Sequence, residues 1–536
     1  MGFRRPAVLG PLQQLLGHGD LQDLAELARW SAAELGAGFI LINPLHAAEP
    51  LPPISNSPYL PMTRLFVSPL YLRVEKIPEH DALSAEHKQQ IEGLARPLKT
   101  ASTTADLIDR DKVWQAKRTA LELIFRQPRS RDRREAFARF RAARNPDLAH
   151  WSAWCALAER HGPDWRAWPA NVADPAGGEG TVAADPALRA AADFHEWLQW
   201  QADEQLAGAQ RAAKNAGMAH GIIGDLAVGV HPGGADAWAY REYLVPGFSV
   251  GAPPDSFNQL GQDWAQPPWH PRRLAAAGYQ PQADLFAAGL RHGSGLRVDH
   301  VMGLMRLWWI PAGQPPDRGA YVSYDHRASV GALTGAAAAA GALAIGEDLG
   351  TVDKWISEYL ASQGVLGTMM AWFATEPDGR PMRPDRWRRD CMATVGTHDV
   401  PPVSGFVTGD QVTVRARLGL LSKPLERERA EADAMLSGWR AALQSEGLIR
   451  PDSMPRPAQF TVAMYGYLRK TPALLLGVSL ADAVGDVRTQ NIPGTSDEYP
   501  NWRIPLCDAQ GSSVLLEQLP DVELLREVCA AVQGPG

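Results

Sequence analysis

The chain has 536 residues, of which 45% are hydrophobic and 21% charged, a composition that excludes a disordered protein. Its net charge of −7, from 53 basic and 60 acidic residues, argues against a broad nucleic-acid-binding function. The four cysteines lie far apart without a CxxC pair, so we expect neither a disulfide framework nor a cysteine-rich zinc site.

The N-terminal residues contain two arginines but no sustained apolar run, so we expect no signal peptide. The longest apolar run, residues 330–346, is rich in alanine and glycine and is too short and too weakly hydrophobic to span a bilayer. We therefore expect a cytoplasmic protein with no membrane partner.

Short apolar runs that end in polar residues recur along the chain. A helix is predicted over 20–34, and strand-like runs follow at 38–46, 221–230, 295–301, 342–348, 365–373, 393–399 and 473–480. Continuous apolar runs of this length are typical of buried parallel strands. Helices are predicted between the later runs, at 332–342, 352–362 and 415–446. This alternation favours an α/β fold, and the polar strand ends favour a (β/α)₈ TIM barrel over a doubly wound sheet.

Residues 84–215 are helix-rich and charged, with almost no strand signal. The segment 126–145 contains eight arginines, which we interpret as a solvated helix face rather than a nucleic-acid patch. The predicted organisation is a first part of the catalytic barrel at 1–83, an inserted, mainly helical subdomain at 84–215, and the remainder of the barrel with loop insertions at 216–536.

Several catalytic motifs are absent from the sequence. It contains no GxGxxG after a strand, no GxxxxGK[ST] and no HExxH. Nucleotide-binding and metalloprotease functions therefore have no support.

Three carboxylates stand at the ends of separate strand-like runs: Asp299, Glu347 and Asp399. They are 48 and 52 residues apart, which is about one strand–helix unit each. Because a barrel brings its C-terminal strand ends to one rim, we expect these side chains to lie together.

Each acid has a notable neighbour. Arg297 lies two residues before Asp299, so both side chains share one face of the strand. We expect this guanidinium to hold Asp299 ionised and to lower its pKa. His398 is adjacent to Asp399, and Asp348, which follows the second acid, is expected to point to the opposite face.

An ionised carboxylate beside a protonated one is what glycosidic bond cleavage requires. In a retaining enzyme the two groups lie about 5–5.5 Å apart, one as nucleophile and the other as acid and base. A third carboxylate stabilises the positive charge of the transition state. The alternative is that each acid caps a helix or forms a structural ion pair, but three together favour catalysis.

Seven segments closely resemble the 4-α-glucanotransferases of glycoside hydrolase family 77, also called amylomaltases or disproportionating enzymes. They are SPYLPMTR (57–64), GDLAVGVHPGGADAW (224–238), APPDSFNQLGQDW (252–264), LRVDHVMGLMRLWWIP (296–311), AIGEDLGTV (344–352), GTHDVP (396–401) and NIPGTSDEYPNWR (491–503). The resemblance implies a (β/α)₈ barrel with inserted subdomains that needs no metal or organic cofactor. It also implies a reaction in which a maltodextrin segment moves, with retention, to the 4-hydroxyl of an acceptor glucan or glucose.

The resemblance assigns roles residue by residue. Asp299 matches the family nucleophile, Glu347 the general acid/base and Asp399 the transition-state stabiliser. The matching substrate-binding residues are Arg297 and His398 at subsite −1, Asp225 and Asn491 near the same sugar, and Ser57, Tyr59, Gln262 and Trp264 in the loops that hold the glucan.

Some of these residues also have structural alternatives. An exposed Tyr59 ring can stack on a sugar, but a packed core tyrosine is an equal alternative. Trp264 lies in a loop rich in glycine and proline, which favours a sugar platform over a core position. For Asn491, capping of a turn ranks equally with ligand binding.

The sequence departs from the family at three places. Pro402 stands where threonine is common, Ala265 replaces a frequent glycine, and residues 62–63 replace small polar residues. These departures affect the expected subsite preference and acceptor choice rather than catalysis. Relatives often carry a region before the barrel, whereas this chain begins almost at the first predicted barrel helix.

Two alternative functions use the same residues. A hydrolase would use the same three acids with water as the acceptor, and only the acceptor loops separate it from a transferase. A glucan-binding protein on a decayed barrel is disfavoured, because binding alone does not need an acid/base pair.

Overall fold

The computed structural model of the chain describes residues 6–9, 19–254, 260–350, 352–451 and 453–533. Most of the N-terminal stretch considered for a signal peptide lies outside these ranges. Residues 255–259 and 351, which belong to two of the resembling segments, also lie outside them. None of the helices within the described ranges is long and apolar enough to cross a membrane.

Eight parallel strands form the central sheet, and their spatial order equals their order in the chain. They are β1 (Pro6–Leu9), β2 (Phe39–Leu41), β5 (Gly221–Leu226), β8 (Gly295–Val298), β11 (Leu343–Gly346), β12 (Gly367–Met370), β13 (Cys391–Thr394) and β14 (Leu475–Ser479). The two end strands meet through a parallel bridge between Ile345 and Leu366. There the Leu366 N–H donates to the Ala344 carbonyl at 3.0 Å, so the sheet closes and the predicted (β/α)₈ barrel is confirmed.

The barrel interior is filled by apolar side chains from five strands. Phe39, Ile223, Ile345, Met392 and Leu475 form one buried cluster. Because these side chains pack the lower part of the barrel, the polar groups that follow the strands are confined to its C-terminal rim.

One barrel strand was missed, and one predicted helix was wrong. Strand β1 was not predicted, because four residues, PAVL, are too short to stand out by periodicity. The helix predicted over 415–446 is two helices, α15 (Asp410–Arg417) and α16 (Leu425–Ser445). Gly419, with a left-handed φ of 69°, and Pro424 separate them. The helices α2 (Leu21–Leu35), α12 (His326–Ala340) and α13 (Lys354–Ser362) lie where they were predicted, within a few residues.

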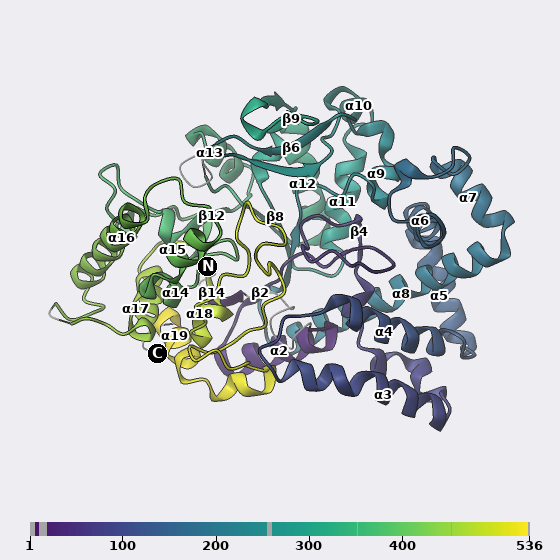
Figure 1. Cartoon of the computed structure of the whole chain (residues 1–536), viewed down its shortest axis with the longest axis horizontal. Helices are drawn as coiled ribbons and strands as arrows, with labels where there is room; N and C mark the ends of the chain where they lie inside the picture. Colours follow the sequence, from purple (N-terminus) through teal and green to yellow (C-terminus); the bar gives the residue numbers. More distant parts are fainter. Residues whose placement is uncertain (1–5, 10–18, 255–259, 351, 452, 534–536) are drawn as a thin grey trace.

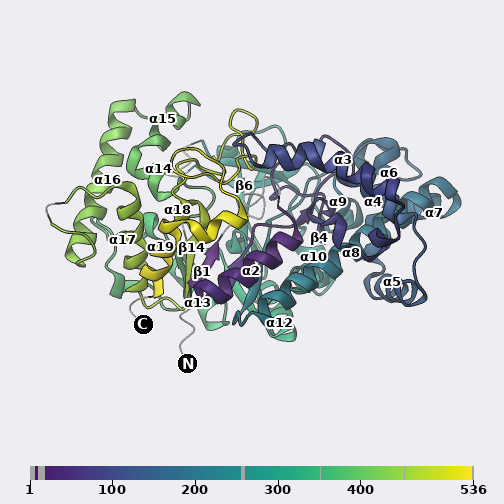
Figure 2. The same cartoon turned by 90° about the horizontal axis from the view of Figure 1, so that it is seen from below.

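Six helices lie between the second and third barrel strands. They are α3 (Ala85–Ser102), α4 (Arg110–Phe125), α5 (Arg131–Arg144), α6 (Asp147–His161), α7 (Pro175–Ala184) and α8 (Pro186–Asn215). Figures 1 and 2 show them at the end of the molecule opposite to α16. The long α8 packs against both α6 and the barrel helix α2, so it belongs to both layers.

The arginine-rich segment is only partly a solvated face. Arg131 has 83% of its side chain exposed, as predicted. Arg133 instead pairs with Glu79 at 2.8 Å and Glu204 at 2.6 Å, and its guanidinium lies 3.9 Å from the centre of the Trp200 ring. The charge of Arg133 is therefore neutralised inside the helical layer and is not available to bind a polyanion.

A four-stranded antiparallel sheet, which was not predicted, lies above the barrel in Figure 1. Its strands are β6 (Phe248–Ala252), β7 (Gln262–Gln266), β9 (Arg306–Pro311) and β10 (Ala320–Ser323), in the order β10-β9-β6-β7. A second small pair, β3 (His46–Ala47) and β4 (Thr63–Val67), encloses the loop that contains SPY. The antiparallel sheet and the β3–β4 pair hold the loops that surround the C-terminal rim of the barrel.

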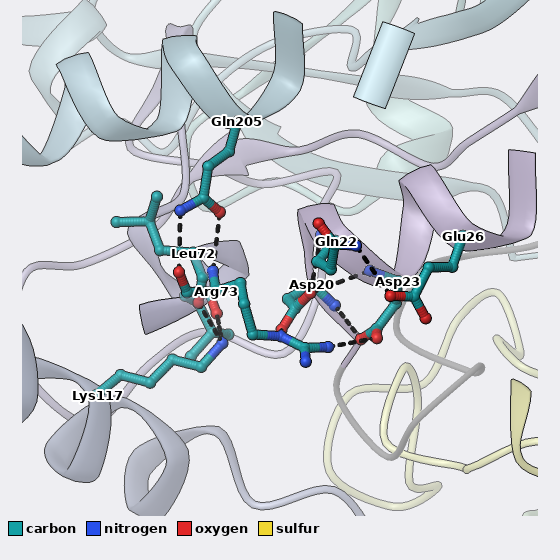
Figure 3. Close-up of polar contacts among 9 residues, drawn as sticks. Asp20, Gln22, Asp23, Glu26, Leu72, Arg73, Lys117 and Gln205 are labelled. Atoms are coloured by element: carbon teal, nitrogen blue, oxygen red, sulfur yellow. Dashed lines mark hydrogen bonds and ion pairs between the residues drawn. The ribbon is translucent and has the colours of Figure 1, made fainter. Parts of the chain in front are cut away.

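A buried polar cluster joins α2 to the six helices (Figure 3). Asp20 and Asp23 form a capping box at the start of α2, and both carboxylates pair with Arg73. Gln205 of α8 exchanges two hydrogen bonds of 2.9 Å with the Arg73 backbone. Lys117 of α4 donates to two carbonyls of the same loop at 2.7 and 2.9 Å. The loop that carries Arg73 thus helps to fix the helical layer to the barrel.

Stability is expected to depend on pH through Asp23. Burial and the neighbouring Asp20 raise its pKa from 3.8 to about 7, against the opposing effect of Arg73. The folded chain therefore holds this proton where the unfolded chain has lost it, so the contribution of Asp23 to stability falls as the pH rises from 4 to 7. Asp23→Asn is expected to flatten that fall, measured as urea midpoints at pH 5 and 7. The exposed Glu26→Gln is the matched control, and an unchanged slope in Asp23→Asn would contradict the assignment.

Candidate active site

The predicted acids lie at the C-terminal rim. Asp299 directly follows β8, Glu347 directly follows β11, and Asp399 lies in the loop after β13. The Asp299 N–H donates to the Leu226 carbonyl and the Glu347 N–H to the Val298 carbonyl, both at 3.0 Å. Each of these two acids is thus fixed to the strand next to its own, and the two stand on adjacent strands.

One guanidinium joins two carboxylates at this rim. Arg297 of β8 lies opposite Asp225 of β5 in the strand register. Its Nη1 donates to both Asp225 oxygens at 2.8 and 2.7 Å, and its Nη2 lies 3.1 Å from Asp299 Oδ1. Tyr59 donates its hydroxyl to Asp225 Oδ2 at 2.7 Å. The SPY loop is therefore tied to the same charge network.

Arg297 acts on the pKa of Asp299 in the expected direction, but the expectation that this pKa is lowered overall was wrong. Burial raises this pKa to about 7; Arg297 opposes the rise, and the carboxylates Asp225 and Glu347 add to it. Proximity in the sequence identified Arg297, which favours the ionised form of Asp299. It did not identify Asp225 and Glu347, which disfavour that form and come from other strands.

Glu347 is also held against ionisation. Burial raises its pKa, while Arg297 and the backbone N–H groups of Leu349 (2.7 Å) and His300 (3.0 Å) oppose the rise. Because Asp299 and Glu347 interact electrostatically, they titrate as a pair that resists losing both protons. Such a pair supplies one ionised and one protonated carboxyl group near neutral pH.

Asp348 points away from the rim, as predicted. Its buried carboxylate makes two hydrogen bonds with Arg388, at 2.6 and 3.0 Å, and accepts the Thr368 N–H at 2.8 Å. It therefore anchors the segment that carries Glu347 to β12 and to the loop before β13.

Asp399 is the most open of the three acids, with 43% of its side chain exposed. His398 Nε2 lies 3.3 Å from Oδ2, and Asn491 Nδ2 donates to Oδ1 at 2.7 Å. The surrounding protein alone would raise the pKa of Asp399, but His398 and the hydrogen bond from Asn491 outweigh this and lower it. Burial likewise opposes the charge on His398, and Asp399 outweighs it, so the pKa of His398 is raised. Asn491 thus contacts a proposed catalytic acid, beyond any role in the turn.

The ring of Tyr59 lies between two other rings. Its centre is 5.0 Å from that of His398 and 5.3 Å from that of Trp502. Ser57 Oγ accepts the Tyr59 N–H at 3.2 Å and so shapes the turn beneath it. Trp502 was missed as a site residue, although it lies in a resembling segment. Its left-handed φ of 63° is visible only in the structure.

Trp264 and Gln262 approach the rim from β7. Trp264 Nε1 donates to Gln262 Oε1 at 3.2 Å, and the indole meets the His300 ring edge-on, with centres 5.1 Å apart. His300 follows Asp299 directly and has an unusual φ of 44°. The half-buried Trp264 therefore stands close to the chain that carries Asp299.

A cavity of about 90 Å³ lies behind the loop 396–402. Asp225, Arg297 and His398 line it together with Asn43 and Gln490. The side-chain amide nitrogens of Asn43 and Gln490 have no hydrogen-bond partner among the described residues. Donors of this kind suit water or hydroxyl groups. Within the described ranges, no group of three or more His, Cys, Asp or Glu side chains is arranged to hold a metal ion.

Ala265 is expected to destabilise the strand β7, in which it lies. It has a φ of 56° in the left-handed region, which costs a non-glycine residue about 1–2 kcal/mol. Ala265→Gly is expected to raise the free energy of unfolding by about 1 kcal/mol, after the entropy cost of glycine is subtracted. Urea denaturation tests this. Gly251→Ala in the adjacent strand is the control with the opposite expected effect. It is expected to lower stability, because its Cβ would lie 1.9 Å from the Gln262 carbonyl oxygen. A stability loss in Ala265→Gly would refute the strain.

Comparisons with known proteins agree with this geometry. The sequence profile of the family described as 4-alpha-glucanotransferase matches residues 11–509. A 4-alpha-glucanotransferase of Mycobacterium tuberculosis is 50% identical over 517 residues, covering 95% of this chain and 71% of the relative. One of Haemophilus influenzae is 32% identical, covering 91% of this chain and 73% of the relative.

Two solved structures share the fold. The amylomaltase from Corynebacterium glutamicum has a TM-score of 0.91 and 42% identity, over 99% of this chain and 75% of that one. The amylomaltase from Streptococcus agalactiae, solved in complex with acarbose, has a TM-score of 0.76 over 99% of this chain and all of that one, and at 17% identity it supports the fold alone. With its closed barrel and acidic rim, the chain belongs to the 4-α-glucanotransferases of glycoside hydrolase family 77 and transfers glucan segments.

Proposed function

We propose that the chain transfers α-1,4-glucan segments by double displacement, with Asp299 as the nucleophile and Glu347 as the general acid and base. The observation that carries this assignment is the 3.1 Å contact of Arg297 with Asp299. Within the described ranges, Glu347 forms no ion pair with this guanidinium. The cation favours the negative charge on Asp299 and so leaves the shared proton with Glu347.

The two halves of the reaction use these groups in turn. A carboxylate oxygen of Asp299 attacks the anomeric carbon of the donor while Glu347 protonates the departing glycosidic oxygen. This gives a glycosyl ester on Asp299 and an ionised Glu347. Glu347 then removes the proton from the 4-hydroxyl of an acceptor, which displaces Asp299 and restores the α-configuration.

Asp399 is proposed to stabilise the positive charge that develops on the sugar. His398 and Asn491 support this role, because their contacts lower its pKa and keep it ionised. The same proposal assigns the substrate-binding residues as Arg297, His398, Asp225 and Asn491 around the first donor sugar, and Ser57, Tyr59, Gln262 and Trp264 along the glucan.

Several finer points belong to this proposal. We propose maltodextrins, glycogen fragments and glucose as the physiological donors and acceptors, and the cytoplasm as the place of the reaction. We also propose the division into 1–83, 84–215 and 216–536, with the middle part as an inserted subdomain. Its helices pack around Trp151 and Trp154 in a hydrophobic core that also includes side chains of the flanking segments, such as Phe66 and Trp238. This core is separate from the cluster inside the barrel, which supports the division.

Incubation with maltotriose alone tests the activity. A ladder of longer maltodextrins together with glucose, without a net gain in reducing ends, is the expected result. Maltose and glucose with rising reducing ends and no ladder would instead identify water as the acceptor and overturn the transferase. Chromatography of the products, with separate assays for glucose and maltose, distinguishes the two outcomes.

A further inference from the structure

The start of α4 meets two loops that surround the site. Residues 108–114 contact loop 50–59, which contains Tyr59, and loop 489–503, which contains Trp502. The contacts are Ile54 N–H to Asp111 Oδ1 (2.7 Å), Trp114 Nε1 to the Pro50 carbonyl (2.9 Å), Ile108 N–H to the Arg503 carbonyl (2.8 Å) and Arg503 Nε to the Ile108 carbonyl (3.2 Å). The helical layer is therefore joined to both loops at one short segment.

Arg110 lies at the centre of this segment. Its guanidinium is buried, with 4% of the residue exposed. Nη2 donates to the Trp502 carbonyl at 2.6 Å, and Nη1 donates to Asn56 Oδ1 at 3.2 Å. A planar guanidinium fixes the relative position of two acceptors better than a single ammonium does. Burial lowers the pKa of Arg110 to about 10, so it remains charged at neutral pH.

The contact with Trp502 continues to the rim. Trp502 has a φ of 63°, a left-handed conformation that is strained for a non-glycine residue and persists only when neighbours hold it. Its ring lies 4.9 Å from His398 and 5.3 Å from Tyr59, centre to centre. Both of those residues hydrogen-bond or pair with the acids of the site.

We propose that Arg110 is a positioning residue for the transferase reaction, acting through Trp502 on Tyr59 and His398. It holds the Trp502 carbonyl and the Asn56 side chain in one plane, and so fixes the two loops that close on the first donor sugar. The helices inserted between the barrel strands thereby take part in substrate binding at a distance. This proposal rests on the proposed function for the location of that sugar.

A double-mutant cycle tests the proposal. Arg110→Gln is expected to lower kcat/KM for maltotriose at least about tenfold, with a raised KM, because the loops lose their common anchor. The kcat/KM of Arg110→Lys is expected to lie between those of the wild type and of Arg110→Gln, since an ammonium cannot bridge both acceptors in the same way. In a Trp502→Ala background the effect of Arg110→Gln is expected to shrink to about threefold or less.

Arg133→Gln is the matched control, because Arg133 is a half-buried arginine of the same helical layer whose partners, Glu79, Glu204 and the Trp200 ring, lie outside both loops. It is expected to lower thermal stability and to leave kcat/KM within about twofold of the wild type. Equal effects of Arg110→Gln with and without Trp502 would overturn the proposal, as would an unchanged kcat/KM. If Arg110→Gln does not fold, Arg110→Lys carries the cycle. Failure of the proposed function is detected separately, as turnover that survives loss of Asp299 or Glu347.

Discussion

Glu347→Gln is expected to abolish turnover of maltotriose while glucan binding remains. Glutamine has almost the same shape as the protonated acid but cannot deliver a proton to the departing oxygen. We expect kcat to fall by at least about 10³-fold, in line with the loss of a general acid that also serves as the base. The affinity for maltotriose, measured by calorimetry, is expected to change little.

A donor with a better leaving group separates the two half-reactions. α-Maltosyl fluoride needs little protonation to leave, so Glu347→Gln is expected to form the glycosyl ester on Asp299 and then stall, because no base activates the acceptor. Mass spectrometry of the intact protein would detect this ester. Glu358→Gln, the same substitution at an exposed residue on α13, is the control. Undiminished turnover of maltotriose in Glu347→Gln would refute the assigned role.

The same variant reports on the coupling between the two acids. Glu347 contributes to the raised pKa of Asp299, so its neutralisation is expected to lower that pKa. Attack on maltosyl fluoride requires an ionised Asp299, so the acidic limb of the rate of ester formation should move to lower pH than in the wild type. A limb that does not move would mean that Glu347 does not contribute to the pKa of Asp299.

The strand ends were the most predictable part of the molecule. Asp299 and Glu347 each follow a continuous apolar run, and the closure of a parallel barrel then brings such positions to one rim. The strand period of two also predicted that Arg297 shares a face with Asp299 and that Asp348 points away. These features depend on local sequence and on the one fact that the fold is a barrel.

The remaining features depend on residues that are distant in the sequence. The contact of Arg110 with Trp502 joins residues 392 positions apart, and no local periodicity reports it. The raised pKa of Asp299 likewise depends on Asp225, from another strand. The antiparallel sheet above the rim escaped prediction because its short strands are interrupted by loops rich in glycine and proline, whose pattern indicates turns more strongly than strands.

Asp299→Asn is expected to lose turnover by at least about 10⁴-fold, because an amide cannot form the glycosyl ester on which the mechanism depends. Unlike Glu347→Gln, it is expected to remain inactive with α-maltosyl fluoride, since an improved leaving group does not replace a missing nucleophile. The exposed Asp317→Asn provides the matched control. Product formation from the fluoride by Asp299→Asn, at a rate near that of the wild type, would assign the nucleophile elsewhere.

Azide can act as an external nucleophile in variants that lack one of the two carboxylates. The anomeric configuration of the azide product distinguishes the roles of the two acids most sharply. In Asp299→Ala, azide has room to enter on the face that the carboxylate leaves, and it is expected to displace fluoride with inversion to give β-maltosyl azide. In Glu347→Ala, the ester on Asp299 still forms, and azide attacks it from the opposite face to give α-maltosyl azide. NMR of the anomeric proton separates the two products. The same anomer from both variants would show that the two carboxylates do not stand on opposite faces of the sugar, and the double-displacement assignment would then fail.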